Sequence, residues 1–544
     1  MNENSSTRRL LVGLTTALPR FTPSRTRVSV RRGRVMSRQN LVQRLGVFGV
    51  VLALVAGCSL SSGASSQPTG TTTPSAALPA TASPTPTSAA APSASPSAAL
   101  QLGWPHTTSW QILDALFGED GRVVMIETDE QSDQTRVNTL AADSTVLDGW
   151  PWTPAGTGSD TSARAALGPD DSVYVAVRGK LHRLSSAGTE LPGFPVDLPS
   201  LPWCGLNAAA DGSAFVTCQD EDEEAGTTST VVTAIRPDGS TAAGWPVRLA
   251  GSGESVGFRP DGALVVGTSE EKTSTITVVG RDGRVLSGWP QIVGGTASIT
   301  LDARGRVRIT ARTWTEGQCA PAARTVYSML EPDGKRSAGW PISMKGWASD
   351  PEIAADGTMY VVTDAGRAVA YSVAGTVIDG WPVSKVDVNV ECAGGSQPWA
   401  AGDGTTVVVG NDRATLLAAD GRVASGWPVT LPYGPASSCG FGCLGSGSPM
   451  EPAVGERAVY IGAYQGDLGH GTEGPNTVQP RVMVVERDGS MPSDAQLLVG
   501  KVGDTLSWLR IAPTGRVWAL TISHLEDGEA GALYLVAEDT ALGS

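Results

Sequence analysis

Histidine and cysteine are the residues of this sequence best suited to catalysis or metal binding, and both types are scarce. The 544 residues include four histidines and seven cysteines. The four histidines show no spacing typical of a catalytic centre: His106, His182, His470 and His524. His470 and His524 are expected in loops on the same face of the fold. A metal or acid–base site there competes with the simpler interpretation of two exposed loop histidines.

Six cysteines are candidates for disulfide bonds. Cys204 and Cys218 flank a segment that resembles two antiparallel strands joined by a turn, so we expect these two residues to lie opposite one another and to form a disulfide. The remaining four allow three pairings: Cys319, Cys392, Cys439 and Cys443. Cys439 and Cys443 could close a small loop. A zinc site is the alternative, which the scarcity of histidine disfavours.

Four tryptophans outside any repeated motif lie near the starts of predicted inner strands: Trp110, Trp203, Trp347 and Trp508. Their rings could stack on a sugar or an aromatic ligand, or they could pack in the core or at the rim. The sequence has no phosphate-binding loop of the Gly-x-x-x-x-Gly-Lys-[Ser/Thr] type. We therefore assign no catalytic residue, no metal and no cofactor.

A recurring tripeptide, Gly-Trp-Pro, predicts the architecture that positions these residues. Its copies lie 41 to 51 residues apart, within the range of a four-stranded propeller blade. Proline cannot donate to a sheet ladder, so the motif suits an outer edge strand, and its Trp would fill the seam between blades. The copies begin at Gly103, Gly149, Gly193 (where Phe replaces Trp), Gly244, Gly288, Gly339, Gly380 and Gly426.

Turn signals between the tripeptides predict antiparallel blades. Sequences such as Ala355-Asp356-Gly357-Thr358 combine Asp-Gly with flanking β-branched residues, a strong hairpin signal. Nine such units can be counted, although eight blades stay possible because the unit around Asp488-Gly489 is irregular. The prediction is an all-β propeller of eight or nine four-stranded blades. We expect the first tripeptide, at Gly103, to close the ring by pairing with the strand near Leu533 to Val536.

The segment from Leu417 through Asp420-Gly421 to Trp427 resembles the repeat of quinoprotein-like (PQQ-like) propellers. This family includes quinone-dependent dehydrogenases and non-catalytic scaffold lipoproteins of the bacterial envelope. The resemblance implies a propeller fold for most of the chain. Neither the capping groups of a quinone site nor the dense Asp-x-Asp-x-Asp run of a calcium loop can be located.

The N-terminal region predicts export and membrane anchoring. Arg38 and Arg44 precede an apolar run, residues 45–56, that suits a signal peptide and is too short to span a bilayer. The run ends at Leu54-Val55-Ala56-Gly57-Cys58, which resembles a bacterial lipoprotein box with Cys58 as the lipidated residue. We divide the chain into a leader at residues 1–57, a disordered Ser/Thr/Pro/Ala-rich linker at 58–99 and a propeller at 100–544. Met36 is an alternative start.

Charge narrows the class of partner. The net charge is −14, and residues 1–57 carry ten arginines and one acid, so the remainder is strongly acidic. Such a body should repel nucleic acid and anionic membrane surfaces. The long connections are all expected on one face, the candidate binding face.

Three functions fit the sequence. Our leading hypothesis is a monomeric, lipid-anchored extracytoplasmic module that binds a protein or an envelope polymer. The alternatives are a quinone-dependent or glycan-active enzyme, and a structural or sensor ectodomain without catalysis.

Overall fold

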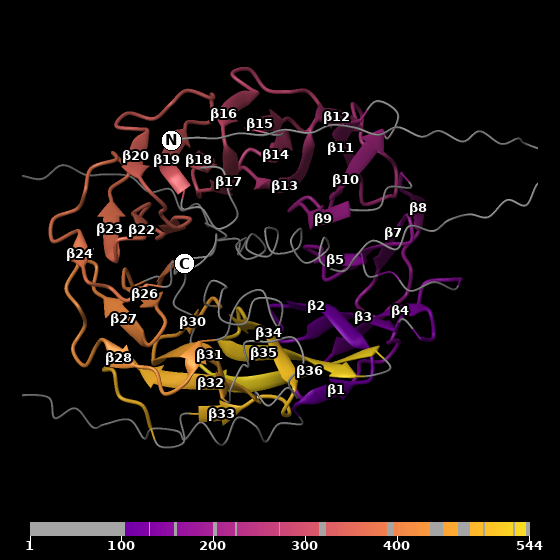
Figure 1. Ribbon diagram of the computed structural model, residues 1–544. Helices are drawn as coiled ribbons and strands as arrows, with labels where there is room; N and C mark the ends of the chain where they lie inside the picture. Colours follow the sequence, from indigo (N-terminus) through magenta and orange to yellow (C-terminus); the bar gives the residue numbers. More distant parts are fainter. Residues whose placement is uncertain are drawn as a thin grey trace, which may run out of the picture. The chain divides into compact units, whose positions relative to one another are not determined.

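Nine antiparallel sheets follow one another around a common axis in the computed structural model (Figure 1). The chain is an all-β, nine-bladed propeller. Its described part contains no helix that is long and apolar enough to cross a membrane. The structure describes residues 104–539 except 130, 157–159, 161, 200–203, 223–225, 271, 315–321, 389–396, 402, 436–449, 466–478, 493–495 and 526–527.

Blades 1 to 3 occupy the first third of the ring. Blade 1 contains β2 (Gln111–Phe117), β3 (Val123–Asp129) and β4 (Gln134–Leu140), with Trp152 bridged to Val137 at its outer edge. Blade 2 contains β5 (Arg164–Leu167), β6 (Val173–Val177), β7 (Lys180–Leu184) and β8 (Val196–Asp197), and blade 3 contains β9 (Cys204–Ala208), β10 (Ala214–Asp222), β11 (Thr227–Ile235) and β12 (Val247–Ala250).

Blades 4 to 6 follow with the same strand order. Blade 4 contains β13 (Ser252–Phe258), β14 (Leu264–Glu270), β15 (Thr273–Val279) and β16 (Gln291–Gly294), and blade 5 contains β17 (Thr296–Leu301), β18 (Val307–Trp314), β19 (Ala322–Leu330) and β20 (Ile342–Lys345). Blade 6 contains β21 (Glu352–Ile353), β22 (Met359–Thr363), β23 (Arg367–Tyr371) and β24 (Val383–Ser384).

Blades 7 to 9 complete the ring. Blade 7 contains β25 (Pro398–Ala400), β26 (Thr406–Val409), β27 (Arg413–Leu417) and β28 (Val429–Thr430). Blade 8 contains β29 (Gly434–Pro435), β30 (Ala453–Val454), β31 (Ala458–Gln465), β32 (Gln479–Glu486) and β33 (Gln496–Leu498), and blade 9 contains β34 (Asp504–Ile511), β35 (Arg516–Leu525), β36 (Gly528–Glu538) and β1 (His106–Thr108).

The N-terminal strand closes the ring as the sequence predicted. β1 pairs antiparallel with β36, and the register joins His106 to Leu533 and Thr108 to Gly531. The ninth blade therefore takes its outer strand from the other end of the chain. Nine blades, rather than eight, are present because Asp488-Gly489 forms a regular turn between β32 and β33.

Asp side chains organise the predicted hairpin turns. In blade 6, Asp356 Oδ1 accepts a hydrogen bond from the backbone N–H of Thr358 at 2.8 Å. The same bond to the residue two positions on recurs in turns of seven other blades, for example at Asp120, Asp261 and Asp488. A short Asp side chain thereby satisfies a turn N–H that the strands leave unpaired.

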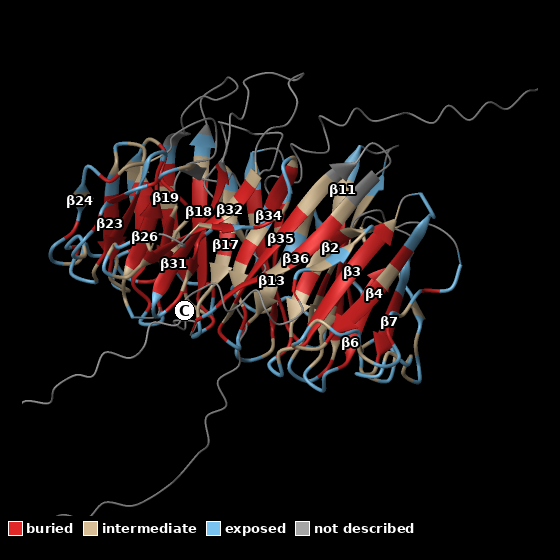
Figure 2. Cartoon of the chain, turned by 90° about the horizontal axis from the view of Figure 1, so that it is seen from below, coloured by how far each residue is buried: buried red, intermediate tan, exposed pale blue. Residues whose placement is uncertain are grey.

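The second strand of each blade is buried on both faces, which explains its continuous apolar sequence. In β3, Val123 and Met125 pack in the seam between blades 9 and 1, whereas Val124 and Ile126 pack in the seam between blades 1 and 2. This alternation follows from the two-residue side-chain period of a strand. The core is thus divided into nine clusters, one at each seam. Figure 2 shows buried residues along the middles of the strands.

Each tripeptide Trp fastens its blade to the next one. Seven indoles are buried, and each Nε1–H donates to a backbone carbonyl in the turn between the third and fourth strands of the following blade. The Nε1–O distances are 3.0–3.3 Å, for Trp104 to Ala142, Trp150 to Ser186, Trp245 to Arg281, Trp289 to Pro332, Trp340 to Val373, Trp381 to Ala419 and Trp427 to Arg487. The predicted seam role is confirmed.

In the described tripeptides, the glycine before the aromatic residue allows this contact. Gly288 has φ 87°, and a Cβ added there would lie 2.0 Å from the carbonyl oxygen of Asp333 in the next blade. No side chain fits between two backbones at that separation. The bond between Trp289 and Pro290 is cis, as are those of the other seven tripeptides.

Where the tripeptide contains Phe194, an arginine alone supplies the donor, whereas at two other seams an arginine donates to the equivalent carbonyl beside the indole. Phe194 has no N–H, and the equivalent carbonyl of Pro237 instead accepts a hydrogen bond from Arg183 Nη1 at 2.8 Å. The same guanidinium donates to Asp170 at 2.8 Å and lies over the Tyr174 ring. The buried carbonyl is therefore satisfied at this seam too, as buried backbone groups generally are.

We expect Gly288→Ala to lower the free energy of unfolding by about 3 kcal/mol or more, because it combines positive-φ strain with a backbone clash. Gly294→Ala is the matched control in the same blade, since a Cβ there meets nothing within 4 Å. Urea unfolding of both variants measures the difference. Equal stability of the two variants would show that the close approach at Gly288 is not required.

We expect Arg183→Met to cost about 2 kcal/mol of stability, since it leaves the Pro237 carbonyl without a donor. Adding Phe194→Trp should recover about 1 kcal/mol of that loss, because an indole N–H supplies this bond at seven other seams. A double-mutant cycle by chemical unfolding gives the coupling. Strict additivity of the two substitutions would contradict the proposed equivalence of Arg183 and the indoles.

Candidate functional site

The two ends of the strands form two unlike faces. The turn face is formed by the connections from the first to the second strand and from the third to the fourth strand of each blade. The loop face is formed by the remaining connections. On the loop face, the connection between β6 and β7 is only Arg178 and Gly179, whereas residues 466–478 join β31 to β32. Varied connections on a regular ring are the usual location of binding residues.

Trp110 lies on the loop face between β1 and β2 and is covered by an arginine. The guanidinium carbon of Arg136 is 4.1 Å from the ring centroid. Arg136 also donates to Glu127 Oε2 at 2.7 Å and to Thr108 at 3.2 Å, so its orientation is fixed. Glu127 is fully buried, and its other oxygen has no hydrogen-bond partner among the described residues. Only part of the Trp110 surface remains accessible.

Trp347 is a packing residue. It is buried, and its backbone N–H donates to Asp364 at 3.1 Å. Arg312 lies 6.0 Å from its ring centroid and forms an ion pair with Asp350 at 3.0 Å across the seam between blades 5 and 6. The core interpretation of Trp347 is therefore the better one.

Trp508 lies within β34 and packs across the seam between blades 9 and 1. Its ring meets Phe117 edge to face with centroids 6.0 Å apart, and Arg510 lies 4.7 Å from its centroid. Arg510 in turn is 3.4 Å from Asp114 of β2. The half-buried indole thus contributes to an aromatic and ionic contact between two blades.

The three described tryptophans do not form one site, because each packs against its own neighbours. Of the other predicted site residues, one cysteine pair is observed, and most of the rest lie outside the described residues. Cys204 and Cys218 face each other across β9 and β10 and form the expected disulfide. His524 lies in β35 rather than in the loop that the sequence predicted, and its side chain is not described. The other candidates lie outside the described residues: Cys58, Trp203, His470, Cys319, Cys392, Cys439 and Cys443.

The two other histidines are half-buried or buried within blades. His182 Nδ1 lies 2.5 Å from Glu190 Oε1, and burial lowers the pKa of His182, as it does that of His106. Throughout the described part of the chain, no group of three or more His, Cys, Asp or Glu side chains is arranged to hold a metal.

Carboxylates on inner strands were not identified from the sequence. Burial first, and then repulsion by Glu451, raise the pKa of Glu352 in β21 to about 8. Partial burial also raises the pKa values of Glu254 in β13 and of Glu451, although both residues keep contact with solvent. Nothing in the sequence around Glu352 marks it, since its environment is created by neighbouring blades.

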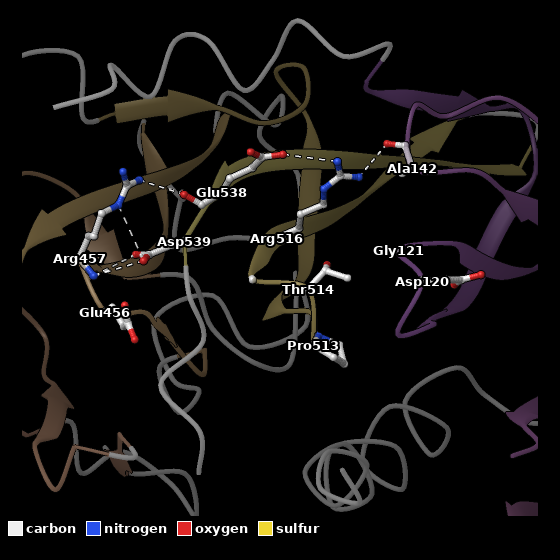
Figure 3. A pocket seen from close by; sticks show the side chains of 11 residues that line it. Asp120, Gly121, Ala142, Glu456, Arg457, Pro513, Thr514, Arg516, Glu538 and Asp539 are labelled. Atoms are coloured by element: carbon white, nitrogen blue, oxygen red, sulfur yellow. Dashed lines mark hydrogen bonds and ion pairs between the residues drawn. The ribbon is translucent and has the colours of Figure 1, made fainter. Parts of the chain in front are cut away.

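A cleft of about 630 Å³ opens on the turn face where blades 8, 9 and 1 meet (Figure 3). Its charged side chains mostly pair with one another. Arg516 lies 3.4 Å from Glu538 and donates to the Ala142 carbonyl, and Arg457 donates to the Glu538 carbonyl. This internal pairing leaves few polar groups for a ligand.

Asp539, beside this cleft, holds together the one seam without a tripeptide. Its buried carboxylate accepts hydrogen bonds from the N–H groups of Arg457 and Ala458 and from the Tyr460 hydroxyl, at 3.1–3.3 Å. These groups belong to blade 8, whereas Asp539 directly follows β36 of blade 9. The main role of the residues around this cleft is therefore to join the blades that close the ring.

No family model matches the sequence, and neither does any curated protein sequence. Solved structures with a similar fold include a eukaryotic initiation factor, at 9% identity and a TM-score of 0.46, covering 75% of this chain and 92% of that one. BamB from Moraxella catarrhalis matches at 15% identity and a TM-score of 0.34, covering 66% and 96%. A prolyl endopeptidase matches at 11% identity and a TM-score of 0.38, covering 79% and 56%.

These likenesses are too distant to transfer a ligand, a partner or an activity. The strand pairing establishes the architecture: the chain is a nine-bladed β-propeller.

Proposed function

We propose that this protein is a membrane-tethered extracytoplasmic module that binds a protein or an envelope polymer through its loop face. The observation that carries the proposal is the contrast between the two faces. The turn face repeats one Asp-based turn in blades 1 to 8, whereas the loop-face connections differ in length and sequence. A ring held rigidly at its seams can present such connections without rearranging.

The tether is the second part of the proposal. Cys58, after its apolar run, would carry the lipid, and residues 59–99 would separate the propeller from the membrane. Acyl chains would supply the anchoring free energy, about 0.8 kcal/mol for each buried methylene. The disulfide between Cys204 and Cys218 is consistent with an oxidising compartment.

We expect partner binding to fall when the loop face is shortened. Residues 466–478 are replaced by the two-residue connection Arg178 and Gly179 of blade 2, and binding to envelope extract is measured with wild type alongside. The control replaces exposed turn-face residues Lys335 and Arg422 by Ser and should retain binding. Full binding by the shortened variant, with loss in the turn-face control, would place the interaction on the opposite face.

The tether is checked separately in the same cells. We expect Cys58→Ser to move the protein from the membrane fraction to the soluble fraction while its folded propeller is retained. An unchanged distribution after this substitution would exclude a lipid on Cys58 as the anchor.

A further inference from the structure

One position of the repeat breaks a pattern that the other blades keep. The second residue after the tripeptide proline is exposed in all eight copies. In seven of them it is polar: Thr107, Thr153, Asp197, Arg248, Ser343, Ser384 and Thr430. In blade 4 it is Ile292, which is 70% exposed, more than any other large apolar side chain in the described residues. Packing inside the propeller gives no reason for this exception.

Ile292 lies on the outer edge of its sheet. It belongs to β16, which pairs with β15 on one side and ends the sheet on the other. The outward backbone N–H and C=O groups of such an edge are able to pair with another strand. Gly294, at the next outward position, adds no obstruction, because a Cβ there would meet no atom within 4 Å.

Charged residues protect neighbouring edges but are absent from this one. β12 carries Arg248, which pairs with Asp220, and β20 carries Lys345. From Val285 to Leu301 the sequence has no charged residue. Charges on an edge strand oppose strand addition, so β16 lacks the protection that natural sheets usually have.

We propose that β16 is a docking edge for an extended, uncharged segment of a partner polypeptide, which adds to blade 4 as a fifth strand. Backbone hydrogen bonds to β16 would hold the segment, and an apolar side chain of the segment would cover Ile292. This rim surface is separate from the loop face.

A second copy of the chain fits this edge less well than a flexible segment does. Four residues at about 3.3 Å each give a contact only about 13 Å long. Two convex rims that meet along such a line would bury much less than the roughly 1,200–2,000 Å² of stable interfaces. A flexible segment is not subject to this limit, because it can also cover the surface beside β16, including the exposed Val285.

The test selects peptides from a random nine-residue phage library on the purified full-length protein and measures their affinity by fluorescence anisotropy. We expect uncharged peptides rich in β-branched residues. Ile292→Lys and Ile292→Thr should weaken binding about tenfold or more, since each removes the apolar contact. The fold should tolerate both changes, because seven blades carry a polar residue at this position. Ser343→Lys in β20, the same position one blade on, is the matched control and should leave affinity unchanged.

N-methylation of alternate peptide amides should abolish binding if the peptide adds as a strand, because it removes backbone donors. The proposal is overturned if no peptide is selected, if the selected peptides bind Ile292→Lys as well as wild type, or if methylation has no effect. It is also overturned if sedimentation shows a wild-type dimer that Ile292→Lys dissociates, since the occupant would then be a second copy.

Discussion

The structure depends on the close approach of two backbones at seven of its nine seams. The glycine of one blade's tripeptide lies against the turn between the third and fourth strands of the next blade, and the indole N–H beside it binds a carbonyl of the same turn. Glycine permits the approach, Trp fills the seam and supplies the donor, and Pro tolerates the edge position. A tripeptide of this kind positions a blade relative to its neighbour, so repeating it produces a ring.

Two seams show which part of this arrangement is essential. Phe194 keeps the aromatic ring of the tripeptide but has no N–H donor. Arg183, which lies in the same blade as Phe194, donates to the carbonyl of Pro237 instead. Between blades 8 and 9 the whole motif is absent, and the buried carboxylate of Asp539 binds backbone and hydroxyl donors of blade 8 instead. In both cases the buried polar groups remain hydrogen-bonded, although different residues provide the bonds. A seam therefore requires that its buried polar groups are hydrogen-bonded more strictly than it requires one particular side chain.

The repeat made the fold predictable, whereas the candidate sites depend on contacts that no repeat encodes. Gly-Trp-Pro spacing and Asp-Gly turns were sufficient for the blade, the seam position of Trp and the pairing of β1 with β36. The Cys204–Cys218 disulfide followed from strand register. The partner of Trp347, the ion pair of Arg510 with Asp114 and the environment of Glu352 each arise between blades, where neighbours in space are distant in sequence. In the sequence, Ile292 resembles any other strand residue. It stands out only when the exposed fractions of the side chains at all eight equivalent positions are compared.

Hydrogen exchange of the indole N–H groups tests the seam account most directly. With selective ¹⁵N labelling of tryptophan, the seven bonded tripeptide indoles should exchange slowly, through opening of the propeller, while half-exposed Trp110 should exchange much faster. Rapid exchange of the tripeptide indoles in the native protein, at rates like that of Trp110, would contradict the claim that these bonds hold the blades together.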